Sequence, residues 1–362
     1  MVDLGRVEVP VSPPYPVVIG SGLNVAEVVS GELQPNLAAI LTDSNVGPTH
    51  AAHLARSLES AGWHVADIVE VPAGEPSKGI SAYAGVAGRL ARAGMMRDAT
   101  LFTLGGGVVG DLGGFVAATF MRGIDLVALP TSLLAMVDSS VGGKVGVDLP
   151  EGKNLLGSFL QPRLVAADLD WLHTLPDREL SRGLAEVVKM GLLSGGGYFD
   201  DLERTEAAVE RDPDALRALV LDSVRFKAQV VAEDELESGR RAILNYGHTI
   251  GHGLEAAAGY ALAHGEAVAV GMVAAAHLAR EKLGTDLVAL HEDLLVSARL
   301  PTTAPALEPE KVLAAMGRDK KRRTADGAAG YRFVLLEDVG EPVWGVAVDE
   351  EEARWAIEVV VG

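Results

Sequence analysis

Three histidines in the second half of the chain have the residue type and spacing of metal ligands. His248 and His252 are four residues apart, which places both imidazoles on one face if the segment is an α-helix. His264 follows a turn signal at Gly259 and precedes the next long apolar run. Neutral imidazole is the commonest side-chain metal ligand, and a catalytic zinc takes three nitrogen or oxygen ligands and keeps one position open. The spacing leaves two interpretations open: a metal site, or a pair of small-residue helices with incidental histidines.

A carboxylate on another predicted helix could complete such a site. Glu186 lies among apolar residues, and Lys189 follows three residues later on the same helical face. A carboxylate in apolar surroundings requires a partner, so this pair is either an ordinary surface ion pair or part of a site with two histidines and one glutamate. Arg241 and Asn245 precede His248 by seven and three residues, and within one continuous helix they would face the same pocket.

The composition describes an acidic chain without cysteine. Its 362 residues suggest two domains. Because cysteine is absent, disulfides, thiolate metal sites and a cysteine nucleophile are excluded, and any metal must be bound by histidine and carboxylate. The formal net charge of -19 argues against nucleic acid and anionic membranes as partners, so local groups of basic residues point to an anionic small molecule. The start of the chain shows no apolar leader and the longest apolar runs are too short to cross a bilayer, so we expect a cytoplasmic protein.

The first half of the chain alternates short apolar strands with amphipathic helices. We expect strands over 6–9, 15–19, 37–42, 65–71, 99–104, 125–129 and 163–168 and helices over 49–61, 81–93 and the stretch from the 105–114 turn to 119. This alternation predicts a mostly parallel sheet with helices on both faces. Ser81 is a fair helix N-cap. Residues 1–175 are therefore expected to form an α/β Rossmann-like dinucleotide-binding domain.

The pattern changes to helical periodicity beyond a boundary at Leu175-Pro176-Asp177. Helices are expected over 178–193, 214–232, 244–258, 264–282, 286–298 and 308–316, followed by a hairpin of 331–336 with 343–348. Asp349 could cap a C-terminal helix. Residues 176–362 are therefore expected to form a mainly α-helical metal- and substrate-binding domain.

The run Gly105-Gly106-Gly107-Val108-Val109-Gly110 fits G-x-G-x-x-G, follows a strand and opens a helix. Glycines there let the backbone approach a pyrophosphate at a helix N-terminus. The motif lies on a later βα unit than in a standard Rossmann fold, and the next residue, Asp111, would crowd a phosphate unless it binds something else. Asp43 and Asn45, at an earlier strand end, could hold a ribose. We favour a dinucleotide spread along several strand ends over a Gly-rich packing contact.

The segment from Asp138 to Asn154 is polar and Gly-rich and contains Lys144 and Lys153. It lacks the spacing of a P-loop. Two interpretations are equal here: a loop that folds over an anionic substrate, or a solvated loop.

Together these stretches resemble the 3-dehydroquinate synthases, a family of the sugar-phosphate cyclase superfamily. The matching stretches, in family order along nearly the whole chain, are 105–111, 130–144, 152–157, 185–189, 244–255, 264–268 and 318–321. Val145, Asp148 and Leu160 stand where many members have Thr, Asn and His. The departure at Asp148 puts any role for that side chain in doubt.

The resemblance implies a reaction of the shikimate pathway. 3-Deoxy-D-arabino-heptulosonate 7-phosphate becomes 3-dehydroquinate and phosphate by transient NAD-dependent oxidation, phosphate elimination, reduction and intramolecular aldol cyclisation. It implies Zn2+ or Co2+ on Glu186, His248 and His264, with His252 as a substrate contact that handles a proton. It also implies a homodimer in which Arg122 reaches the phosphate site of the neighbouring subunit.

The resemblance further implies two sets of binding residues. The NAD contacts are Asp43, Asn45, Glu75, Lys78, Gly105, Gly106, Gly107, Val108, Val109, Gly110, Asp111, Thr131, Ser132, Lys144, Lys153 and Thr174. The substrate contacts are Asp138, Lys144, Lys153, Asn154, Lys189, Arg241, Asn245, His252 and either Lys320 or Lys321.

Three other functions compete with this one. A metal-dependent polyol dehydrogenase of the glycerol dehydrogenase type shares the architecture but has no need for Lys144, Lys153 and Arg241. A different sugar-phosphate cyclase is the second, and the stretches 138–144 and 241–252 favour a 3-dehydroquinate synthase over it. A nucleotide-binding protein without activity would not need Glu186 and two histidines together.

Overall fold

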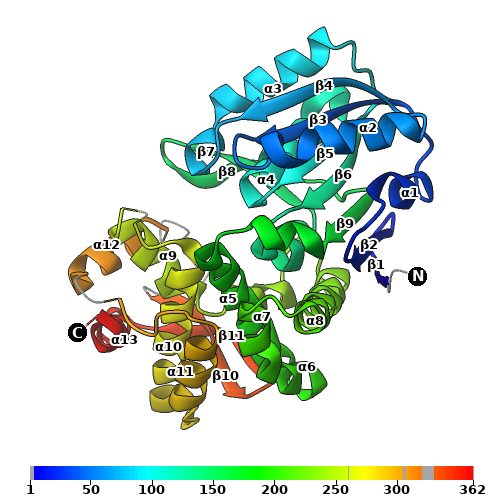
Figure 1. The fold of residues 1–362 in the computed structure, drawn as a ribbon. Helices are drawn as coiled ribbons and strands as arrows, with labels where there is room; N and C mark the ends of the chain where they lie inside the picture. Colours follow the sequence, from blue (N-terminus) through cyan, green and yellow to red (C-terminus); the bar gives the residue numbers. More distant parts are fainter. Residues whose placement is uncertain (1–3, 260, 305–306, 320–329, 362) are drawn as a thin grey trace. The chain divides into compact units, whose positions relative to one another are not determined.

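The computed structural model describes residues 4–259, 261–304, 307–319 and 330–361. Contacts divide the chain into two compact units, one of Met1–Leu175 with Val220–Leu236 and one of Pro176–Leu219 with Glu237–Gly362. The expected domain boundary is a single division after residue 175, whereas this division returns a later segment to the first unit. Figure 1 shows the helices and strands of the chain.

The first unit is built on a seven-stranded sheet whose strand order is β1-β2-β9-β6-β5-β3-β4. The strands are β1 (Gly5–Val9), β2 (Tyr15–Gly20), β3 (Leu37–Asp43), β4 (His64–Val71), β5 (Thr100–Gly105), β6 (Asp125–Pro130) and β9 (Leu164–Asp168). All pairs are parallel except β1 with β2. Every residue of β2, β5 and β9 is buried, as expected for strands covered on both faces. The expected parallel sheet is confirmed.

Helices cover both faces of this sheet. They are α1 (Val25–Ser30), α2 (Ala52–Ser60), α3 (Ile80–Arg92) and α4 (Gly107–Thr119), with short turns η1 (Gly47–Ala51), η2 (Glu75–Ser77), η3 (Phe120–Arg122), η4 (Ala135–Ser139) and η5 (Leu169–Thr174). Leu58 of α2 and Phe102 of β5 belong to one buried cluster, whereas Leu90 of α3, Leu112 of α4 and Leu101 of β5 belong to another. Neighbouring residues of β5 thus point to opposite faces, as a pleated strand requires.

The start of α3 differs from the expectation. The helix begins at Ile80 after Gly79, which makes no side-chain cap. Ser81 is therefore inside the first turn, and the prediction that it is the N-cap is wrong. Gly79 instead forms a β-bridge with Asp148, which fixes where the helix can begin.

A β-hairpin occupies most of the Gly-rich segment that was expected to be a loop. β7 (Lys144–Leu149) pairs antiparallel with β8 (Gly152–Phe159). The two backbones approach closely at Gly146 and Gly157, because a Cβ atom at Gly157 would lie 2.5 Å from the carbonyl oxygen of Val145. The glycines that suggested a loop in the sequence are what lets these strands meet.

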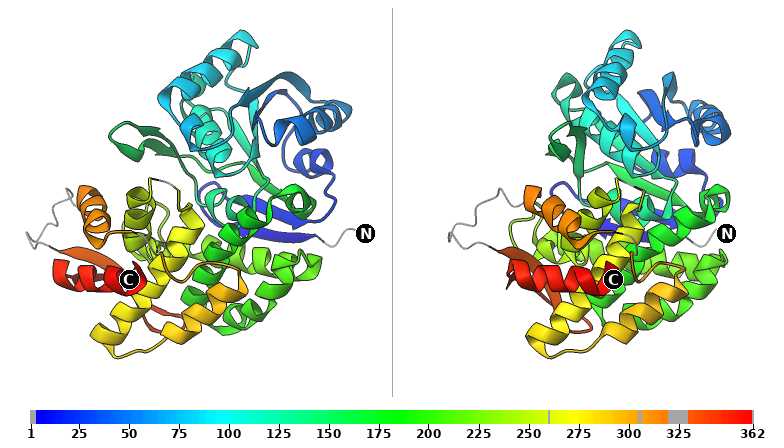
Figure 2. Two further views of the ribbon diagram at one scale, coloured as in Figure 1. Left: turned by 60° about the vertical axis from the view of Figure 1, so that its left-hand side comes forward. Right: turned by 90° about the vertical axis from the view of Figure 1, so that its left-hand side faces the viewer.

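The second unit is mainly helical. Its elements are α5 (Asp177–Ser194), α6 (Gly196–Asp201), η6 (Leu202–Arg204), α7 (Thr205–Val209), η7 (Arg240–Asn245), α9 (His248–Ala257), α10 (His264–Leu283), α11 (Val288–Ser297), α12 (Pro309–Asp319), β10 (Tyr331–Asp338), β11 (Glu341–Val348) and α13 (Glu350–Val361). α8 (Pro213–Glu233) begins in this unit and ends in the first. α10 packs against α5, α9, α11, α13 and β10 (Figure 2). Its small apolar residues are buried on every side, which is typical of a central helix.

The helix expected over 244–258 begins only at His248. Arg241 and Asn245 lie in the separate turn η7, and Gly247 then adopts a left-handed backbone with φ +76°. A Cβ atom at Gly247 would lie 2.6 Å from Cγ of Met272 on α10. The prediction that Arg241 and Asn245 share a helical face with His248 is therefore wrong, because packing against α10 breaks the helix at this glycine.

The C-terminal helix is capped as expected. Oδ1 of Asp349 accepts a hydrogen bond from the Glu352 amide (2.8 Å), and Oε2 of Glu352 accepts one from the Asp349 amide (2.9 Å). This reciprocal pair is a capping box.

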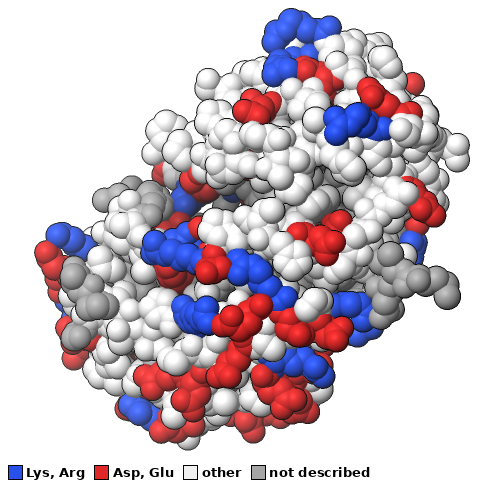
Figure 3. Space-filling model, in the orientation of Figure 1, with Lys and Arg blue, Asp and Glu red and all other residues white. Residues whose placement is uncertain are grey.

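Acidic and basic side chains are interspersed on the face drawn in Figure 3, where neither sign forms one continuous surface. Among the described residues, no helix combines the length and the apolar character that a membrane span requires.

Candidate metal centre and nucleotide-binding edge

Three helices of the second unit bring one carboxylate and two imidazoles together. Glu186 lies on α5, and His248 and His264 are the first residues of α9 and α10. One ligand atom from each lies within 4.8 Å of the others. The Oε1 atom of Glu186 is 3.6 Å from Nε2 of His248 and 3.8 Å from Nε2 of His264. These spacings leave room for an ion bound between the three groups.

Glu186 is the buried anion of this cluster. Its side chain is fully buried, and neither carboxylate oxygen has a hydrogen-bond partner among the described residues. Lys189 forms a close ion pair with it, although the geometry is not that of a hydrogen bond, and the same ammonium donates to the carbonyl of Leu244 (2.7 Å). A buried carboxylate without donors is costly. A cation beside Glu186 would relieve that cost.

His248 is held in the form that binds metals. Its Nδ1 atom donates to the carbonyl of Tyr246 (3.0 Å), so the unprotonated Nε2 faces Glu186. Burial lowers the pKa of His248 well below its usual value, and the positive charge of Lys189 lowers it further. The imidazole is therefore neutral, with its lone pair directed into the cluster.

His264 has a different electrostatic environment. Its Nδ1 atom lies 3.4 Å from Oε2 of Glu255. Burial lowers the pKa of His264, but the Glu255 hydrogen bond and the charges of Glu186 and Glu255 outweigh burial, so that this pKa lies above its usual value. No spacing in the sequence singles out Glu255. Glu255 meets His264 only because α10 begins at His264 and packs against α9, and the spacing of residues in the sequence does not reveal this packing.

His252 lies one turn along α9 from His248. Its ring centroid is 5.2 Å from that of His248 and 5.8 Å from that of His264, and its side chain is exposed. The structure therefore gathers all three imidazoles, but it groups only His248 and His264 with Glu186. Which of them hold an ion stays a prediction.

Two further basic or polar residues of the second unit were expected at the substrate. Arg241 is buried in η7, and Asn245 is exposed and donates to Oε1 of Glu237 (3.0 Å). Glu237 was not predicted, because the turn that brings it to Asn245 has no sequence signature. Lys320 and Lys321 lie outside the described residues.

In the first unit, the predicted nucleotide contacts follow the carboxyl ends of neighbouring strands. Asp43 ends β3, Gly105 ends β5, and Thr131 and Ser132 follow β6. Oδ1 of Asp43 accepts hydrogen bonds from the amides of Asn45 (2.8 Å) and the next residue (3.1 Å). Ligands of open α/β sheets bind at this edge. The residues expected to contact NAD are thus gathered along it, whereas their contacts with NAD stay a prediction.

The glycine run turns tightly into α4. A Cβ atom at Gly105 would lie 2.6 Å from Cγ2 of Val109, and one at Gly106 would lie 3.4 Å from Oγ of Ser132. Gly106 provides no side-chain cap, so the first amides of the helix remain available. Such an N-terminus attracts an anion, and the turn suits a pyrophosphate.

Lys78 links the glycine turn to the hairpin. Its buried ammonium pairs with Asp111 (2.5 Å) and donates to Oδ1 of Asn154 (2.6 Å). Burial raises the pKa of Asp111, and Lys78 only partly offsets this. Asp111 thus has the partner it was expected to need. A second pair joins Lys153 to Glu75 at 3.2 Å.

Asp148, which stands where many family members have Asn, makes a hydrogen bond within the hairpin. Its Oδ1 atom accepts from the Asn154 amide (2.8 Å), and Asn154 has a positive φ of 55°. Asp148 therefore stabilises a strained turn that presents Asn154 to Lys78.

Asp138 has a partner that was not predicted. Lys227 of α8, within the first unit, donates to the Asp138 carbonyl (2.6 Å) and pairs with its carboxylate. The two residues are 89 positions apart, so no local pattern could connect them.

Two other residues with a predicted role also lie in the first unit. Thr174, a predicted NAD contact, donates to the carbonyl of Trp171 (3.0 Å). Arg122, predicted to reach a neighbouring subunit, is exposed and has a φ of +67°.

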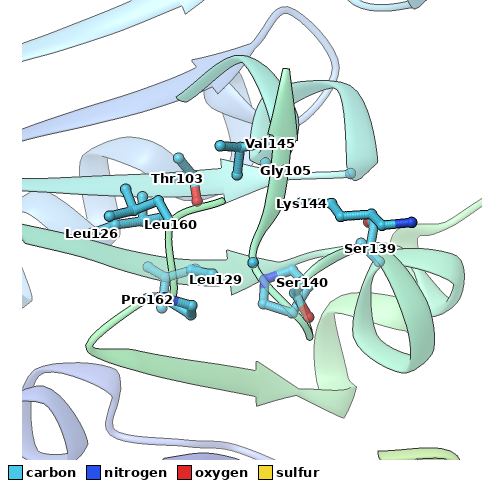
Figure 4. A pocket seen from close by; sticks show the side chains of 16 residues that line it. Thr103, Gly105, Leu126, Leu129, Ser139, Ser140, Lys144, Val145, Leu160 and Pro162 are labelled. Carbon is cyan, nitrogen blue, oxygen red and sulfur yellow. The ribbon is translucent and has the colours of Figure 1, made fainter. Parts of the chain in front are cut away.

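A pocket of the first unit opens beside the glycine turn. Gly105, Gly106 and Gly110 line it. Lys144 and Ser139 lie beside each other at one end of it, while Leu126 and Leu160 lie at the other (Figure 4).

Comparisons with known proteins cover nearly the whole chain. A family model described as 3-dehydroquinate synthase N-terminal matches residues 68–182, and one described as 3-dehydroquinate synthase C-terminal matches residues 183–322. A 3-dehydroquinate synthase of Acidithiobacillus ferrooxidans (strain ATCC 53993 / BNL-5-31) is 46% identical over 94% of this chain and 92% of its own length. One of Symbiobacterium thermophilum is 45% identical over 96% of this chain and 98% of its own length.

Solved structures show the same fold. A 2-deoxy-scyllo-inosose synthase complexed with carbaglucose-6-phosphate, NAD+ and Co2+ has a TM-score of 0.88 at 28% identity, covering 99% of this chain and 100% of that one. The 2-epi-5-epi-valiolone synthase of Streptomyces hygroscopicus subsp. jinggangensis 5008, with NAD+ and Zn2+ bound, has a TM-score of 0.85 at 27% identity, covering 96% of each chain. A glycerol dehydrogenase of Schizosaccharomyces pombe shares the fold alone, at 18% identity and a TM-score of 0.65 over 93% of this chain and 86% of that one. With both family models matched and relatives similar over nearly its whole length, the chain belongs to the 3-dehydroquinate synthase family.

Proposed function

We propose that Glu186, His248 and His264 bind the divalent metal ion with which this 3-dehydroquinate synthase works. The enzyme converts 3-deoxy-D-arabino-heptulosonate 7-phosphate to 3-dehydroquinate and phosphate, with NAD and Zn2+ or Co2+ as cofactors. The observation that carries the metal assignment is the buried Glu186 carboxylate, which has no hydrogen-bond donor among the described residues and two imidazole nitrogens within 3.8 Å.

The donor set fits the metal. Two imidazoles and one carboxylate give three nitrogen and oxygen ligands, which leaves a position open for substrate. The chemistry that the bound cofactors supply is polarisation of substrate hydroxyl groups by the metal and reversible hydride transfer by NAD. His248 contributes a neutral imidazole, and Lys189 keeps positive charge beside Glu186.

The first unit supplies the nucleotide contacts. The glycine turn before α4 receives the pyrophosphate at the helix N-terminus, and Asp43 accepts hydroxyl hydrogen bonds from a ribose. Lys78 holds Asp111 and Asn154 in place beside this turn. Lys153 and Lys144 provide positive charge for anionic groups of the ligands.

His252 handles a proton of the substrate in this proposal. It is exposed beside the two partly buried imidazoles of His248 and His264 and is not part of the group that includes Glu186. An imidazole with solvent access can take and return protons near neutral pH. Arg241, Asn245 and Lys189 bind the substrate in the second unit, and Asp138, Lys153 and Asn154 bind it in the first.

The assembly and the location are further parts of the proposal. The enzyme is a cytoplasmic homodimer, in which the exposed Arg122 of each chain reaches the phosphate site of the other. Either Lys320 or Lys321 adds a cation to the substrate site.

A coupled assay tests the function directly. With heptulosonate phosphate, metal and a catalytic amount of NAD+, we expect continued release of inorganic phosphate without accumulation of NADH. Stoichiometric NADH production would point instead to a polyol dehydrogenase. Phosphate release from a different sugar phosphate only would indicate another cyclase of the same superfamily.

A further inference from the structure

The two imidazoles of the Glu186 cluster are held by different partners. The Nδ1 atom of His248 donates to a backbone carbonyl, that of Tyr246, at 3.0 Å. The Nδ1 atom of His264 faces a carboxylate, that of Glu255, at 3.4 Å, which is the long end of a hydrogen bond. Glu255 has no role in the function proposed above.

Glu255 is buried, which is unusual for a carboxylate. It is 7% exposed on α9, two turns beyond the start of that helix. α9 and α10 lie side by side (Figures 1 and 2). They approach closely because Gly251 has no side chain: a Cβ atom there would lie 3.0 Å from the carbonyl of Ala267. Glu255 follows Gly251 by four residues on the same face, which places its carboxylate opposite His264.

The His264 ring needs such a partner more than the His248 ring does. The side chain of His264 is 34% exposed, against 12% for His248. The backbone before His264 is already fixed, because Glu266 accepts from the Ala263 amide (3.0 Å) and forms two hydrogen bonds with Arg178 (2.6 and 3.0 Å). What remains to be set is the orientation and tautomer of the ring.

We propose that Glu255 is a positioning residue for the metal centre: it accepts the Nδ1 proton of His264 and so directs the Nε2 lone pair at Glu186. It is not itself a ligand, because it contacts the outer nitrogen and lies outside the group formed by Glu186, His248 and His264. A carboxylate in this place fixes the tautomer and makes the imidazole a better donor. The inference rests on the proposed metal site and adds a residue that strengthens it.

Metal affinity of the apoprotein tests this role without any activity measurement. The full chain, stripped of metal, is titrated with Zn2+ in competition with a chelating dye, and with Co2+ by absorption spectroscopy. We expect Glu255→Ala to weaken Zn2+ binding by roughly 10- to 100-fold, with one ion still bound per chain and an altered Co2+ spectrum. Glu255→Gln keeps an acceptor oxygen but loses the charge, so its Zn2+ affinity should fall by less, about threefold to tenfold.

Asp293→Asn is the matched control, since this exposed carboxylate lies on α11 of the same unit. It should bind both metals as the unaltered chain does. Equal Zn2+ affinity and an unchanged Co2+ spectrum in Glu255→Ala would overturn the positioning role while leaving the metal site intact. If Glu255→Ala does not fold, Glu255→Gln decides, because unchanged affinity there has the same meaning. Absence of metal binding by the unaltered chain would overturn the metal assignment itself, and this inference with it.

Discussion

Two lysine–carboxylate pairs, one in each unit, differ in whether the protein itself satisfies the carboxylate. In the first unit, Lys78 pairs with Asp111 at 2.5 Å and also donates to Asn154, so the ammonium and the carboxylate are both bound within the protein. In the second unit, Lys189 pairs with Glu186, yet neither carboxylate oxygen has a hydrogen bond from the part of the chain that the structure describes, and two imidazole nitrogens face one of them. The first pair is complete without a ligand, whereas the second leaves lone pairs for a cation.

The same lysine–carboxylate pairing therefore has a different consequence in each unit. Asp111 follows the glycine turn, where an unpaired carboxylate would repel a phosphate, and Lys78 removes that repulsion. Glu186 has to stay an anion in a fully buried position, and Lys189 provides a positive charge without occupying the face shared with His248 and His264.

The largest expected effect is at Glu186. Glu186→Gln keeps the shape of the side chain but removes its charge, so we expect loss of the bound metal and a fall in phosphate release of roughly 10³-fold. Metal content after dialysis and the rate of phosphate release measure both effects. Glu179→Gln, at a half-exposed position of the same helix, is the control and should keep its metal. Retention of metal and turnover by Glu186→Gln would show that the two pairs do not differ as described.

A substitution in the glycine turn should affect only the first unit. The added methyl of Gly105→Ala would lie 2.6 Å from Val109, so the turn has to shift, and NAD+ affinity should fall by about 10- to 100-fold. A methyl at Gly85, an exposed position of α3, would meet none of the described atoms within 4 Å, which makes Gly85→Ala a matched control of identical chemistry. Calorimetric titration with NAD+ distinguishes them. Similar NAD+ affinities for the two variants would argue against a nucleotide at this turn.

Removal of the lysine of the first pair should have a moderate effect. Lys78→Met removes the ammonium that holds both Asp111 and Asn154 beside the turn, so we expect the KM for NAD+ to rise by about tenfold as the turn loses these contacts. Metal content should not change. Lys311→Met, at an exposed pair with Glu308, serves as control. A Lys78→Met enzyme that lost its metal but kept its KM would reverse the assignment of the two units.

The smallest effect concerns a buried imidazole away from the cluster. His291 accepts from the Tyr246 hydroxyl (2.7 Å), because its Nδ1 atom donates to the Leu287 carbonyl (2.7 Å). Burial lowers the pKa of His291 to about 4. A histidine whose folded pKa lies below its unfolded value of about 6.5 contributes stability above that value, and this stability is lost as pH falls from 6.5 towards 4.

Between pH 7 and pH 5, His291 should therefore account for about 2 kcal/mol of lost unfolding free energy. His291→Gln keeps a donor and an acceptor but does not titrate. The free energy of unfolding of this variant should therefore fall by less between pH 7 and pH 5 than that of the unaltered chain. Urea unfolding at both pH values, with a chelator present so that metal does not contribute, measures the difference. Equal losses in the two proteins would show that folding does not lower the pKa of His291.

The sheet and most helices could be predicted because their signal is local. The central strands β5 and β9 are short, fully buried and mostly apolar runs, and Asp349 caps its helix with neighbouring residues only. The break at Gly247 could not be predicted, since its left-handed backbone follows from contact with Met272 of another helix. The hairpin β7–β8 was missed because its glycines suggest a loop.

The candidate site shows the same limit. Spacing brought His248 and His252 together and left the metal ligands open, since the place of His264 depends on the packing of α9 against α10. Lys227 and Glu255 have partners that only the tertiary structure brings near. Resemblance to a family predicted a ligand set of Glu186, His248 and His264, which spacing alone left open.

The most direct test of the metal assignment is one Co2+ titration of three histidine variants in parallel. His248→Ala and His264→Ala should each lose bound Co2+ at concentrations that saturate the unaltered chain, because each lacks one of three ligands. His252→Ala should still bind one ion per chain. Loss of Co2+ by His252→Ala equal to that of the other two would contradict the account, since it would make His252 a ligand and leave the Glu186 cluster wrongly assigned.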